Sequence, residues 1–318
     1  MVVNMFSECI KEIRKKQNLT QLEFSTHLNL IDAEFHALDA VTVSRWERGI
    51  TKPSLKKCIR ILRLFDYDLK YFLLNNDYAS DMSALDTIMD KRFNDRLLKL
   101  HNIQQYYYNN INHVEFKIKT IPKDQRMIIN LLSSLYNHLD IEKDSLFNID
   151  LYLYQTRNKL IGLTFHNNDD DHILGHSISF YFNTDEFSSQ IKNNKCKIDY
   201  TKSIAYKEGK DITLYNCSRY SSSEELFKFQ IINDVSLLCK NSSIQYYSIR
   251  LGLKIMYDFL ISLGFELSSY QNEHPKGEIS VGRKKYRDAI LSVKVEKLLS
   301  NVELINILKE EKVQGISG

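Results

Sequence analysis

Proline, glycine and cysteine are scarce in this chain of 318 residues, which holds three prolines, ten glycines and five cysteines. So little glycine and proline excludes collagen-like and low-complexity chains. The cysteines are odd in number and far apart, without paired ligand spacing: Cys9, Cys58, Cys196, Cys217 and Cys239. This pattern argues against a disulfide framework and against a zinc site, so we expect a cytoplasmic location and no bound metal.

Long hydrophobic runs are also absent. Glu8 and Lys11 interrupt the N-terminal segment before an apolar stretch can form, so no signal peptide is expected. No later stretch approaches the roughly 20 uncharged apolar residues that a membrane-spanning helix needs. The sequence therefore predicts a protein with no membrane partner.

Positive and negative charges nearly balance, with 43 Lys and Arg against 40 Asp and Glu, which excludes a strongly basic coat protein. The balance is uneven along the chain. Residues 1–63 hold six Lys and five Arg against seven acids, a net charge of +4, whereas the remaining residues sum to about −1. A basic first module favours a polyanionic partner, although an ordinary solvated surface would carry the same charge.

The first 76 residues predict a compact all-α domain. Thr20 with Glu23 forms a capping box that opens a helix. Asp39 can cap a further helix, which Gly49 ends in the left-handed conformation. Four short helices are expected in all, over 5–17, from Thr20 onward, over 39–48 and over 55–65.

Residues 77–110 predict one long amphipathic helix that links two domains. Apolar residues recur there in steps of three or four: Leu85, Met89, Phe93, Leu97, Leu100 and Ile103. Such a stripe needs a partner, either the second domain or the same helix of another subunit. The second possibility predicts a homodimer.

Strands with intervening helices predict a mixed α/β domain over 111–272. Within it, residues 149–154 and 159–166 are expected to form a β-hairpin. Residues 249–263 are expected to form a helix that Gly264 stops.

The tail, 273–318, is basic at its start and is predicted to be helical over 288–312. The expected fold class is therefore α+β with two domains. An N-terminal all-α bundle, a long linker helix and a C-terminal mixed α/β domain follow one another along the chain.

Three short motifs in the first domain resemble the helix-turn-helix family of XRE-type, lambda-repressor-like DNA-binding domains: Leu19-Thr20-Gln21-Leu22, Thr42-Val43-Ser44-Arg45-Trp46-Glu47-Arg48-Gly49 and Thr51-Lys52-Pro53. The match covers about residues 6–74, and it implies double-stranded operator DNA as the partner. One departure is an insertion of about eight residues, 31–38, where the family usually has a tight turn. The insertion leaves the tilt of the recognition helix open.

The resemblance and the chemistry of DNA together assign roles to residues of this domain. Gln21 at a helix N-terminus can donate to a phosphate. Arg45 is the expected base reader because its fork matches guanine O6 and N7, although a salt bridge to Glu47 or Asp39 is an alternative. Val43 and Trp46 are expected to be buried. The predicted DNA contacts are Gln21, Ala40, Val41, Thr42, Ser44, Arg45, Arg48 and Lys52.

In the second domain the order of elements from Ile212 to Glu266 resembles the GNAT acyltransferase fold. Cys217-Ser218-Arg219-Tyr220 is similar to the S-R-F segment of acyl-homoserine-lactone synthases. GNAT enzymes hold pyrophosphate on a glycine-containing loop, whereas residues 219–225 have no glycine and include Glu224 and Glu225. This departure counts against acyl-CoA binding, so we expect no catalytic residue and no cofactor.

Several residues of the second domain allow more than one interpretation. Arg219, Ser222 and Ser223 are candidate ligand contacts, but Arg219 in an internal ion pair is at least as favoured. Cys217 is expected to be a buried strand thiol rather than a nucleophile, because the sequence places no histidine beside it. The acidic run 169–171 before His172 favours a solvated loop over a metal site.

The sequence thus predicts a homodimeric transcriptional regulator that binds operator DNA. Its GNAT-like domain is expected either to sense an acyl-type small molecule or to mediate self-association. Two alternatives remain. The first is an active N-acyltransferase that carries a DNA-binding domain, and the second is a structural dimerisation domain without a ligand. A glycine phosphate loop with a defined nucleophile or base would favour the enzyme, and the sequence has neither.

Overall fold

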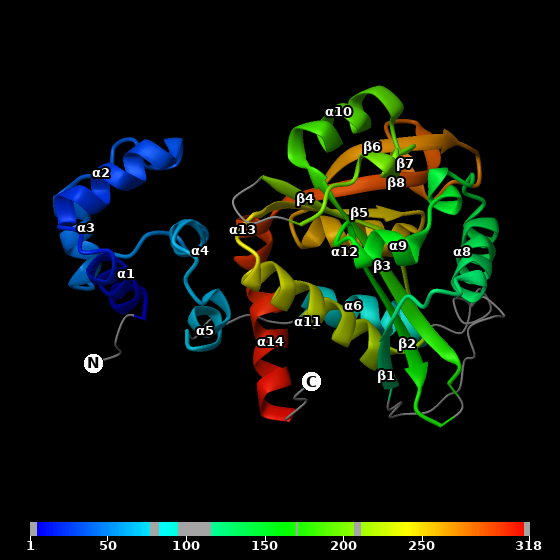
Figure 1. The fold of residues 1–318 in the computed structure, drawn as a ribbon, viewed down its shortest axis with the longest axis horizontal. Coiled ribbons are helices and arrows are strands. Elements are labelled where there is room, and N and C mark those ends of the chain that lie inside the picture. The colour runs from blue at the N-terminus through cyan, green and yellow to red at the C-terminus, as the bar shows by residue number, and fades with distance from the viewer. Residues whose placement is uncertain (1–4, 77–82, 95–115, 170, 207–210, 315–318) are drawn as a thin grey trace. The chain divides into compact units, whose positions relative to one another are not determined.

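The computed structural model divides the chain into two compact units (Figure 1). The described residues are 5–76, 83–94, 116–169, 171–206 and 211–314. Three stretches of sequence, 1–80, 235–242 and 299–318, make up the smaller unit, and 81–234 with 243–298 make up the larger one. The residues of the DNA-binding motifs therefore share a unit with residues from the middle and the end of the chain.

The first part of the smaller unit is all-α, as expected. Its elements are α1 (Met5–Lys16), α2 (Gln21–Ile31), the 3-10 turn η1 (Ala33–Phe35), α3 (Ala40–Glu47), α4 (Leu55–Leu64) and α5 (Leu69–Leu74). The predicted capping box is present, with the Thr20 amide donating to Glu23 at 2.7 Å and the Glu23 amide donating to Thr20 at 3.2 Å. Asp39 caps α3 by accepting from the Thr42 amide at 2.7 Å.

Side chains, rather than a tight turn, hold the inserted segment between α2 and α3. The Asn29 amide group donates to the Leu38 carbonyl at 2.9 Å and accepts from the Leu38 amide at 3.2 Å. Asp32 accepts from the guanidinium of Arg60 on α4 at 2.9 Å. The segment that leads into α3 is therefore tied to both α2 and α4.

Aromatic residues of α1, α3 and α5 form the core of this helical region. The Phe6 ring lies edge-on to Trp46 at 6.0 Å and to Phe72 at 6.5 Å. All three side chains are buried. Edge-to-face pairs at these distances add to the stabilisation that burial of the rings provides.

The later stretches of sequence complete the smaller unit. The Arg63 guanidinium on α4 donates to the carbonyls of Leu238 and Ser242, both at 2.8 Å. Helix α14 (Val302–Gln314) contacts α5, and Lys309 on α14 donates to the Asn76 carbonyl at 2.5 Å. Arg63 therefore satisfies carbonyls at the end of a helix that begins elsewhere in the chain.

An eight-stranded sheet forms the centre of the larger unit. Its strands are β1 (Phe116–Thr120), β2 (Leu160–Asn167), β3 (Ile173–Asn183), β4 (Ile212–Ser221), β5 (Ile244–Leu251), β6 (Glu266–Glu273), β7 (Ile279–Val281) and β8 (Lys284–Lys294). The strand order is β1-β2-β3-β4-β5-β8-β6, and β7 pairs with β8. Neighbouring strands are antiparallel except for β4 and β5, which are parallel. This is the mixed α/β fold class that the sequence predicted.

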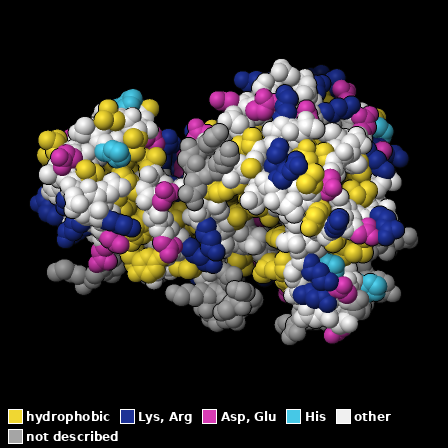
Figure 2. Space-filling view, viewed as in Figure 1, with side chains coloured by type: hydrophobic (Ala, Val, Ile, Leu, Met, Phe, Trp, Pro, Cys, Tyr) yellow, Lys and Arg dark blue, Asp and Glu magenta, His cyan; other side chains and the backbone are white. Residues whose placement is uncertain are grey.

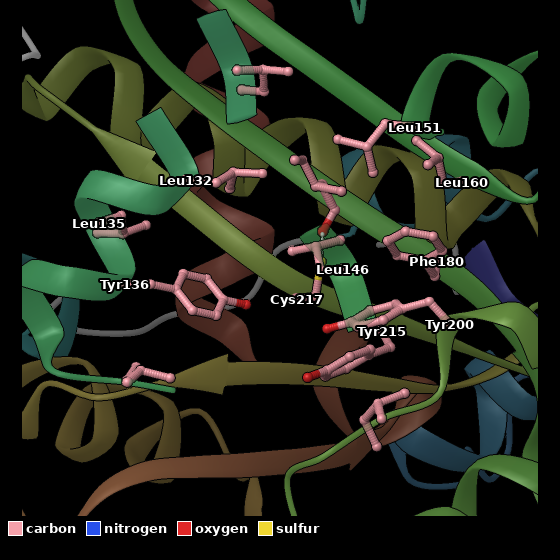
Figure 3. Packing of buried hydrophobic residues seen from close by; sticks show 14 of the residues in the cluster. Leu132, Leu135, Tyr136, Leu146, Leu151, Leu160, Phe180, Tyr200, Tyr215 and Cys217 are labelled. Atoms are coloured by element: carbon pink, nitrogen blue, oxygen red, sulfur yellow. Dashed lines mark hydrogen bonds between the residues drawn. The ribbon is translucent and has the colours of Figure 1, made fainter. Parts of the chain in front are cut away.

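Helices cover both faces of the sheet (Figure 1). They are α8 (Arg126–Leu139), α9 (Leu151–Thr156), α10 (Thr184–Asn194), α11 (Glu224–Lys240), α12 (Lys254–Ser262) and α13 (Val295–Leu299). Leu132 and Tyr136 of α8 pack in one buried cluster with Phe180 and Tyr215 (Figure 3). On the other face, Asp234 of α11 pairs with a strand residue. Helix α11 is shared, because its residues from 235 onward belong to the smaller unit.

The parallel strands β4 and β5 separate toward their carboxyl ends. Their pairing ends at Asn216 and Ile249, although β4 continues to Ser221 and β5 to Leu251. Beyond that point β4 remains paired with β3, and β5 with β8. Because ligands of α/β folds bind outside the carboxyl ends of parallel strands, this part of the sheet is the natural place for a ligand.

Three expectations about individual elements were wrong. Residues 151–156 form the helix α9, capped by Asp150, and not the first strand of a hairpin. Residues 249–251 belong to β5, so α12 begins only at Lys254. Residues 284–294 form β8, and helix follows only from Val295. β8 is buried over 289–291, so its apolar residues are consecutive and lack the alternation of a half-buried strand.

The predicted long linker helix is described only at its start. Residues Ser83–Met89 form α6, and Asp90–Asn94 continue as the π-helical turn η2. Leu85, Met89 and Phe93 are buried, and α6 contacts α12. The remaining stripe residues, Leu97, Leu100 and Ile103, lie outside the described residues. The described part of the stripe is therefore covered within the larger unit, which was the first of the two partners considered.

The cysteines agree with the prediction from their spacing. All five are buried free thiols. Over the described ranges, no helix has both the length and the apolar character that crossing a bilayer requires.

Candidate DNA-binding surface and candidate ligand site

Helix α3 has a buried apolar face and an exposed face that carries both polar and apolar side chains. Val43 and Trp46 are buried, as predicted. Val41 is 56% exposed, and the side chains of Arg45 and Arg48 are exposed as well. The Arg48 Nε donates to the Ser44 carbonyl at 3.3 Å, so this guanidinium lies along its own helix end. An exposed arginine and aliphatic side chain on the first turns of a helix suit contact with base edges in a major groove.

The remaining predicted DNA contacts lie around this helix. Gln21 is the first residue of α2, and Ala40 and Thr42 are partly exposed in the first turn of α3. Lys52 is exposed after α3. All eight predicted residues thus belong to α2, α3 and the segment that follows α3.

A buried carboxylate organises the start of α2 and the end of α3. Glu47 is 4% exposed and accepts from Arg14 of α1 through both oxygens, at 2.5 and 3.2 Å. The Gln21 Nε2 donates to the same carboxylate at 2.7 Å. Burial alone would raise the pKa of Glu47, but the hydrogen bonds from Arg14 and Gln21 lower it. Glu47 therefore stays ionised and holds the Gln21 side chain at the N-terminus of α2.

This network was not foreseen from the sequence. Arg14 and Glu47 are 33 positions apart, and no local pattern connects them. Their pairing removes Glu47 as a salt-bridge partner for Arg45. The Asp39 carboxylate is engaged by Thr42, whose hydrogen bonds lower its pKa, with a smaller contribution from the charge of Arg45. In the part of the chain that the structure describes, Arg45 forms no ion pair with either carboxylate.

Hydrophobic side chains are also exposed on the smaller unit, near its lysines and arginines (Figure 2). Five of the large ones are Leu22, Leu30, Ile31, Val41 and Ile50. Leu30 is the most exposed of them, at 80%. Val41 alone among these five was assigned a role in contacting DNA.

The predicted ligand residue Arg219 of β4 takes part in an internal ion pair. Its guanidinium donates to the carboxylate of Asp234 on α11, and to the Tyr247 hydroxyl of β5 at 2.9 Å. The Tyr247 hydroxyl in turn donates to Asp234 at 2.5 Å. Despite burial, the charge of Asp234 raises the pKa of Arg219. Of the two predicted roles for Arg219, the internal ion pair is the one observed.

The two predicted ligand serines are used by the fold itself. The Ser222 amide donates to the Leu174 carbonyl at 3.0 Å, and the side chain of Ser222 is buried. The Ser223 hydroxyl accepts from the Leu226 amide at 3.2 Å and so caps the start of α11. The amide of Ser222 is therefore not available to a phosphate in this structure.

A second polar cluster is buried on the α8 face of the sheet. Arg250 of β5 donates to Asp288 of β8 at 3.0 Å from Nε and 2.6 Å from Nη2, and it also pairs with Asp144. Its Nη1 donates to the Tyr136 hydroxyl at 3.1 Å. Gln271 of β6 donates to Asp288 at 3.0 Å. These residues come from five separate segments, which explains why the sequence did not bring them together.

Tyr136, Tyr200, Tyr215 and Cys217 belong to the buried hydrophobic cluster of this part of the larger unit (Figure 3). The Cys217 thiol donates to the Ile178 carbonyl at 3.4 Å, and burial raises its pKa, so the thiol is protonated at neutral pH. Over the described residues, the buried Tyr215 hydroxyl has no hydrogen-bond partner. Cys217 is thus the buried strand thiol that was predicted. Its environment raises the pKa of the thiol, whereas an activated nucleophile needs a lowered pKa.

One histidine does lie beside a β4 serine. His176 of β3 is hydrogen-bonded to the Ser218 hydroxyl at 2.7 Å. Burial lowers the pKa of His176 to about 3, helped by the charge of Arg219, so the ring is neutral at physiological pH. Both side chains are buried. The pair therefore stabilises the strand pairing but is closed to a substrate from solvent.

The acidic loop before His172 behaves as a solvated hairpin loop. Asp171 pairs with Lys119 at 2.7 Å and with Lys117 at 2.9 Å, and these lysines lower its pKa to about 2. Asp169 is exposed, whereas residue 170 lies outside the described residues. Across the described ranges, no group of three or more His, Cys, Asp or Glu residues is arranged to hold a metal ion.

Comparison with family models supports the assignment of the first domain. Residues 10–72 match the family model described as helix-turn-helix. No curated protein matches the chain. The predicted resemblance of the N-terminal region to helix-turn-helix DNA-binding domains is therefore confirmed over this segment.

Solved structures similar to the chain include acetyltransferases and an N-acyl amino acid synthase. Arabidopsis thaliana NAA60 in complex with acetyl-CoA is 8% identical, with 57% of this chain and 98% of that chain covered and a TM-score of 0.33. A probable acetyltransferase from Staphylococcus epidermidis is 13% identical, with coverage of 57% and 99% and a TM-score of 0.34. FeeM, an N-acyl amino acid synthase from uncultured soil microbes, is 11% identical, with coverage of 57% and 92% and a TM-score of 0.36. These likenesses assign no activity to this chain.

Proposed function

We propose that the protein is a transcriptional regulator that binds operator DNA through α3. The observation that carries this proposal is the outer surface of α3, where Arg45 is exposed, unpaired with the nearby carboxylates and next to Val41 and Thr42. It lies within the segment that matches a helix-turn-helix family. A guanidinium that is not neutralised by its own domain keeps its charge and two N–H donors for the O6 and N7 atoms of a guanine.

The role of Gln21 follows from the network beneath it. Glu47 holds the Gln21 side chain, and Arg14 holds Glu47, so the first turn of α2 is kept in one arrangement before DNA arrives. The free backbone amides at the start of α2 then face the phosphate backbone. Phosphate contacts of this kind orient the domain, and α3 reads the bases. Arg48 and Lys52 contribute further phosphate contacts.

A regulator of this type binds as a homodimer, because operators with two-fold symmetry need a protein with two-fold symmetry. The described apolar stripe of α6 and η2 is already buried within the larger unit. The proposal of a dimer therefore rests on operator symmetry, and the interface is not assigned to that stripe.

The larger unit serves as a sensing or self-association domain rather than as a working acyl-CoA enzyme. Two observations support this proposal: the Ser222 amide is taken by the Leu174 carbonyl, and Glu224 with Glu225 brings negative charge to the start of α11. An acyl-type effector remains its proposed ligand class. Calorimetric titration of acetyl-CoA and longer acyl-CoA, with a thiol-release assay and an amine acceptor, tests this. Micromolar binding of an acyl-CoA together with steady release of CoA would replace the proposed sensing role by N-acyl transfer.

Selection of bound sequences from a random double-stranded DNA library by the full chain tests the DNA-binding function. We expect enrichment of a single two-fold symmetric sequence. Arg45→Ala should lose the enrichment at one position of each half-site. Arg126→Ala removes an exposed arginine from the larger unit and serves as the control. Binding without any sequence enrichment would exclude an operator-specific regulator.

A further inference from the structure

The hairpin of β7 and β8 carries a concentration of positive charge on the larger unit. Residues 274–287 include five Lys and Arg and one acid, Glu278, a net charge of +4. Since residues 64–318 as a whole sum to about −1, the other residues from position 64 onward sum to about −5. Outside the helix-turn-helix segment, net positive charge is therefore gathered on one short stretch of a negatively charged region.

The tip of this hairpin projects into solvent. Val281 pairs with Lys284, so Gly282 and Arg283 form a two-residue loop. Gly282 has a φ of +61°, and a Cβ at this position would have no atom within 4 Å. Residues 282–285 are all exposed. The tip is therefore accessible even to a large partner.

A second turn lies against the first residues of β8. The His274 amide donates to the Lys285 carbonyl at 3.0 Å, and the Gly277 amide donates to the His274 carbonyl at 2.8 Å. A Cβ at Gly277 would lie 2.6 Å from the backbone of Tyr286, so this turn packs closely on the strand. Lys276, which is exposed on this turn, is therefore held close to β8.

Two of the five cations have acidic partners. Lys284 pairs with Glu273 of β6 at 2.7 Å, and both side chains are exposed. Arg287 pairs with Asp140, which follows α8. These two pairs neutralise the sides of the hairpin rather than its tip.

The other three cations keep their charge available. Within the described residues, Lys276, Arg283 and Lys285 form no ion pair. The one acid of the stretch, Glu278, accepts from the Lys254 amide at 2.8 Å and so serves the start of α12. Three unpaired cations are thus presented on two turns that the backbone of β8 holds together.

A polyanion is the partner that such a surface fits. Like charges close together repel one another, and phosphates that neutralise them relieve the repulsion. Lys and Arg are the side chains with which proteins hold the DNA backbone, and a two-stranded β-ribbon is narrow enough to enter a major groove. Among polyanions, double-stranded DNA is favoured because the same chain contains a segment that matches a helix-turn-helix family.

We propose that this hairpin, through Lys276, Arg283 and Lys285, binds the phosphate backbone of double-stranded DNA outside the bases that α3 contacts. The inference rests on the proposed operator binding, and it adds a second DNA contact from the larger unit. Phosphate contacts carry no sequence information of their own. The hairpin therefore lengthens the DNA that one chain covers without changing the preferred sequence.

Two duplexes that contain the same selected operator test the hairpin. One ends at the operator, and the other is extended on both sides by unrelated sequence. Fluorescence anisotropy with the full chain measures both at several salt concentrations. We expect the extended duplex to bind about tenfold more tightly at low salt, with a steeper slope of log affinity against log salt. Equal affinity and equal slope for the two duplexes would overturn the proposal.

The triple variant Lys276→Gln, Arg283→Gln, Lys285→Gln removes the three unpaired charges. It should lose the gain from the extended duplex and keep both its affinity for the short duplex and its sequence preference. The salt slope on the extended duplex should fall by about one for each contact removed. Its Tm should not fall, because repulsion among the cations is removed. A gain from the extended duplex that persists in this variant would overturn the proposal.

A matched control removes three exposed lysines elsewhere on the larger unit. None of them forms an ion pair within the described residues, and the substitutions are Lys123→Gln, Lys192→Gln and Lys294→Gln. This control should keep the gain from the extended duplex. An equal loss in both triple variants would make the effect one of net charge and would overturn the assignment to the hairpin.

A charge-conserving variant keeps the test valid if the glutamine variant does not fold. Lys276→Arg, Arg283→Lys and Lys285→Arg together retain every charge, so the gain from the extended duplex should remain. Its loss would show that charge is not what the hairpin supplies.

A duplex without the operator separates the hairpin from the proposed regulator. If the natural protein showed no sequence preference, the regulator would fail, yet the glutamine variant should still bind this duplex more weakly than the natural protein. Equal binding by the two would overturn the hairpin proposal. Single-stranded RNA and anionic lipid vesicles are measured beside it. Tighter binding of either, lost in the glutamine variant, would replace DNA as the partner and overturn the proposal.

Discussion

Arg45 and Lys52 are both exposed cations near α3, yet they are expected to act differently on DNA. Arg45→Ala should weaken operator binding by about 1–3 kcal/mol and relax the preference at one base pair, because the arginine fork reads guanine. Lys52→Ala should weaken all sequences alike and reduce the slope of log affinity against log salt by about one. Fluorescence anisotropy with the selected operator and single-base variants measures both. The same sequence-independent effect for the two substitutions would make Arg45 a phosphate contact.

Glu47 allows a prediction about stability as well as binding. Glu47→Ala leaves the Arg14 guanidinium without its carboxylate and should lower the free energy of unfolding by about 2 kcal/mol. It should also weaken DNA binding, because Gln21 loses its partner. Urea denaturation and anisotropy measure the two effects. Glu12→Ala removes an exposed carboxylate from the same helical region as a control, and equal effects of the two substitutions would contradict the prediction.

The pH dependence of this contribution follows from the direction of the shift. The pKa of Glu47 in the folded protein lies below its ordinary value of 4.5. The stabilisation is therefore complete above pH 4.5 and is lost as the pH falls through the lower folded value. Glu47→Ala should consequently lose less stability relative to the natural protein at acidic pH than at pH 7.

At the level of single residues, local motifs of the sequence correctly predicted the caps of short helices. The eight residues predicted to contact DNA lie in α2, α3 and the segment after α3, and their contacts with DNA stay a prediction. The sequence was uninformative where a site is assembled from distant segments. Arg250, Asp144 and Asp288 meet only because β5, β8 and the segment after α8 are brought together by the sheet.

The short helices of the smaller unit illustrate how far capping signals determine an element. Thr20, Asp39 and Ser54 set the N-terminal starts of α2, α3 and α4. Each of these side chains accepts a hydrogen bond from a backbone amide of its own helix. These signals are local and were readable from the sequence. The strand β8 has no such signal, since its position between β5 and β6 depends on pairing with both.

Gly49, the glycine predicted to end α3, is a local signal that can be tested by substitution. Gly49 has a φ of +70°, a conformation in which a side chain is strained. Gly49→Ala should lower the free energy of unfolding by about 1–2 kcal/mol and also weaken DNA binding, because the residues after α3 are displaced. Thr51→Ala, at an exposed position two residues later, is the control. Urea denaturation that gives equal stability for both variants would show that the left-handed turn is not strained by a side chain.

For the molecule as a whole, the fragment 1–76 should be a poor substitute for the full chain. It lacks the carbonyls of Leu238 and Ser242 that accept from Arg63, and it lacks α14, which contacts α5. It also has no second subunit to occupy the other half-site. We expect weaker operator binding and a lower Tm for the fragment. Equal operator affinity of fragment and full chain would contradict both reasons.

The state of association is a second prediction at this scale. Light scattering of the full chain at micromolar concentration should give the mass of a dimer, because a two-fold operator calls for two identical DNA-binding units. The chain itself has a mass of 37.4 kDa, so monomer and dimer are readily distinguished. A monomer that still binds one palindromic site tightly would remove the argument for dimerisation.

The composition of the smaller unit from residues 1–80, 235–242 and 299–318 has a consequence for how the protein is made. A nascent chain emerges from the ribosome with α1 to α5 first, but α14 of the same unit is synthesised only after the larger unit. Contacts between such distant positions form late and slow the folding of a chain. The smaller unit is therefore completed only after translation has delivered the whole larger unit. A product terminated before α14 would consequently carry α3 without the residues that complete its unit.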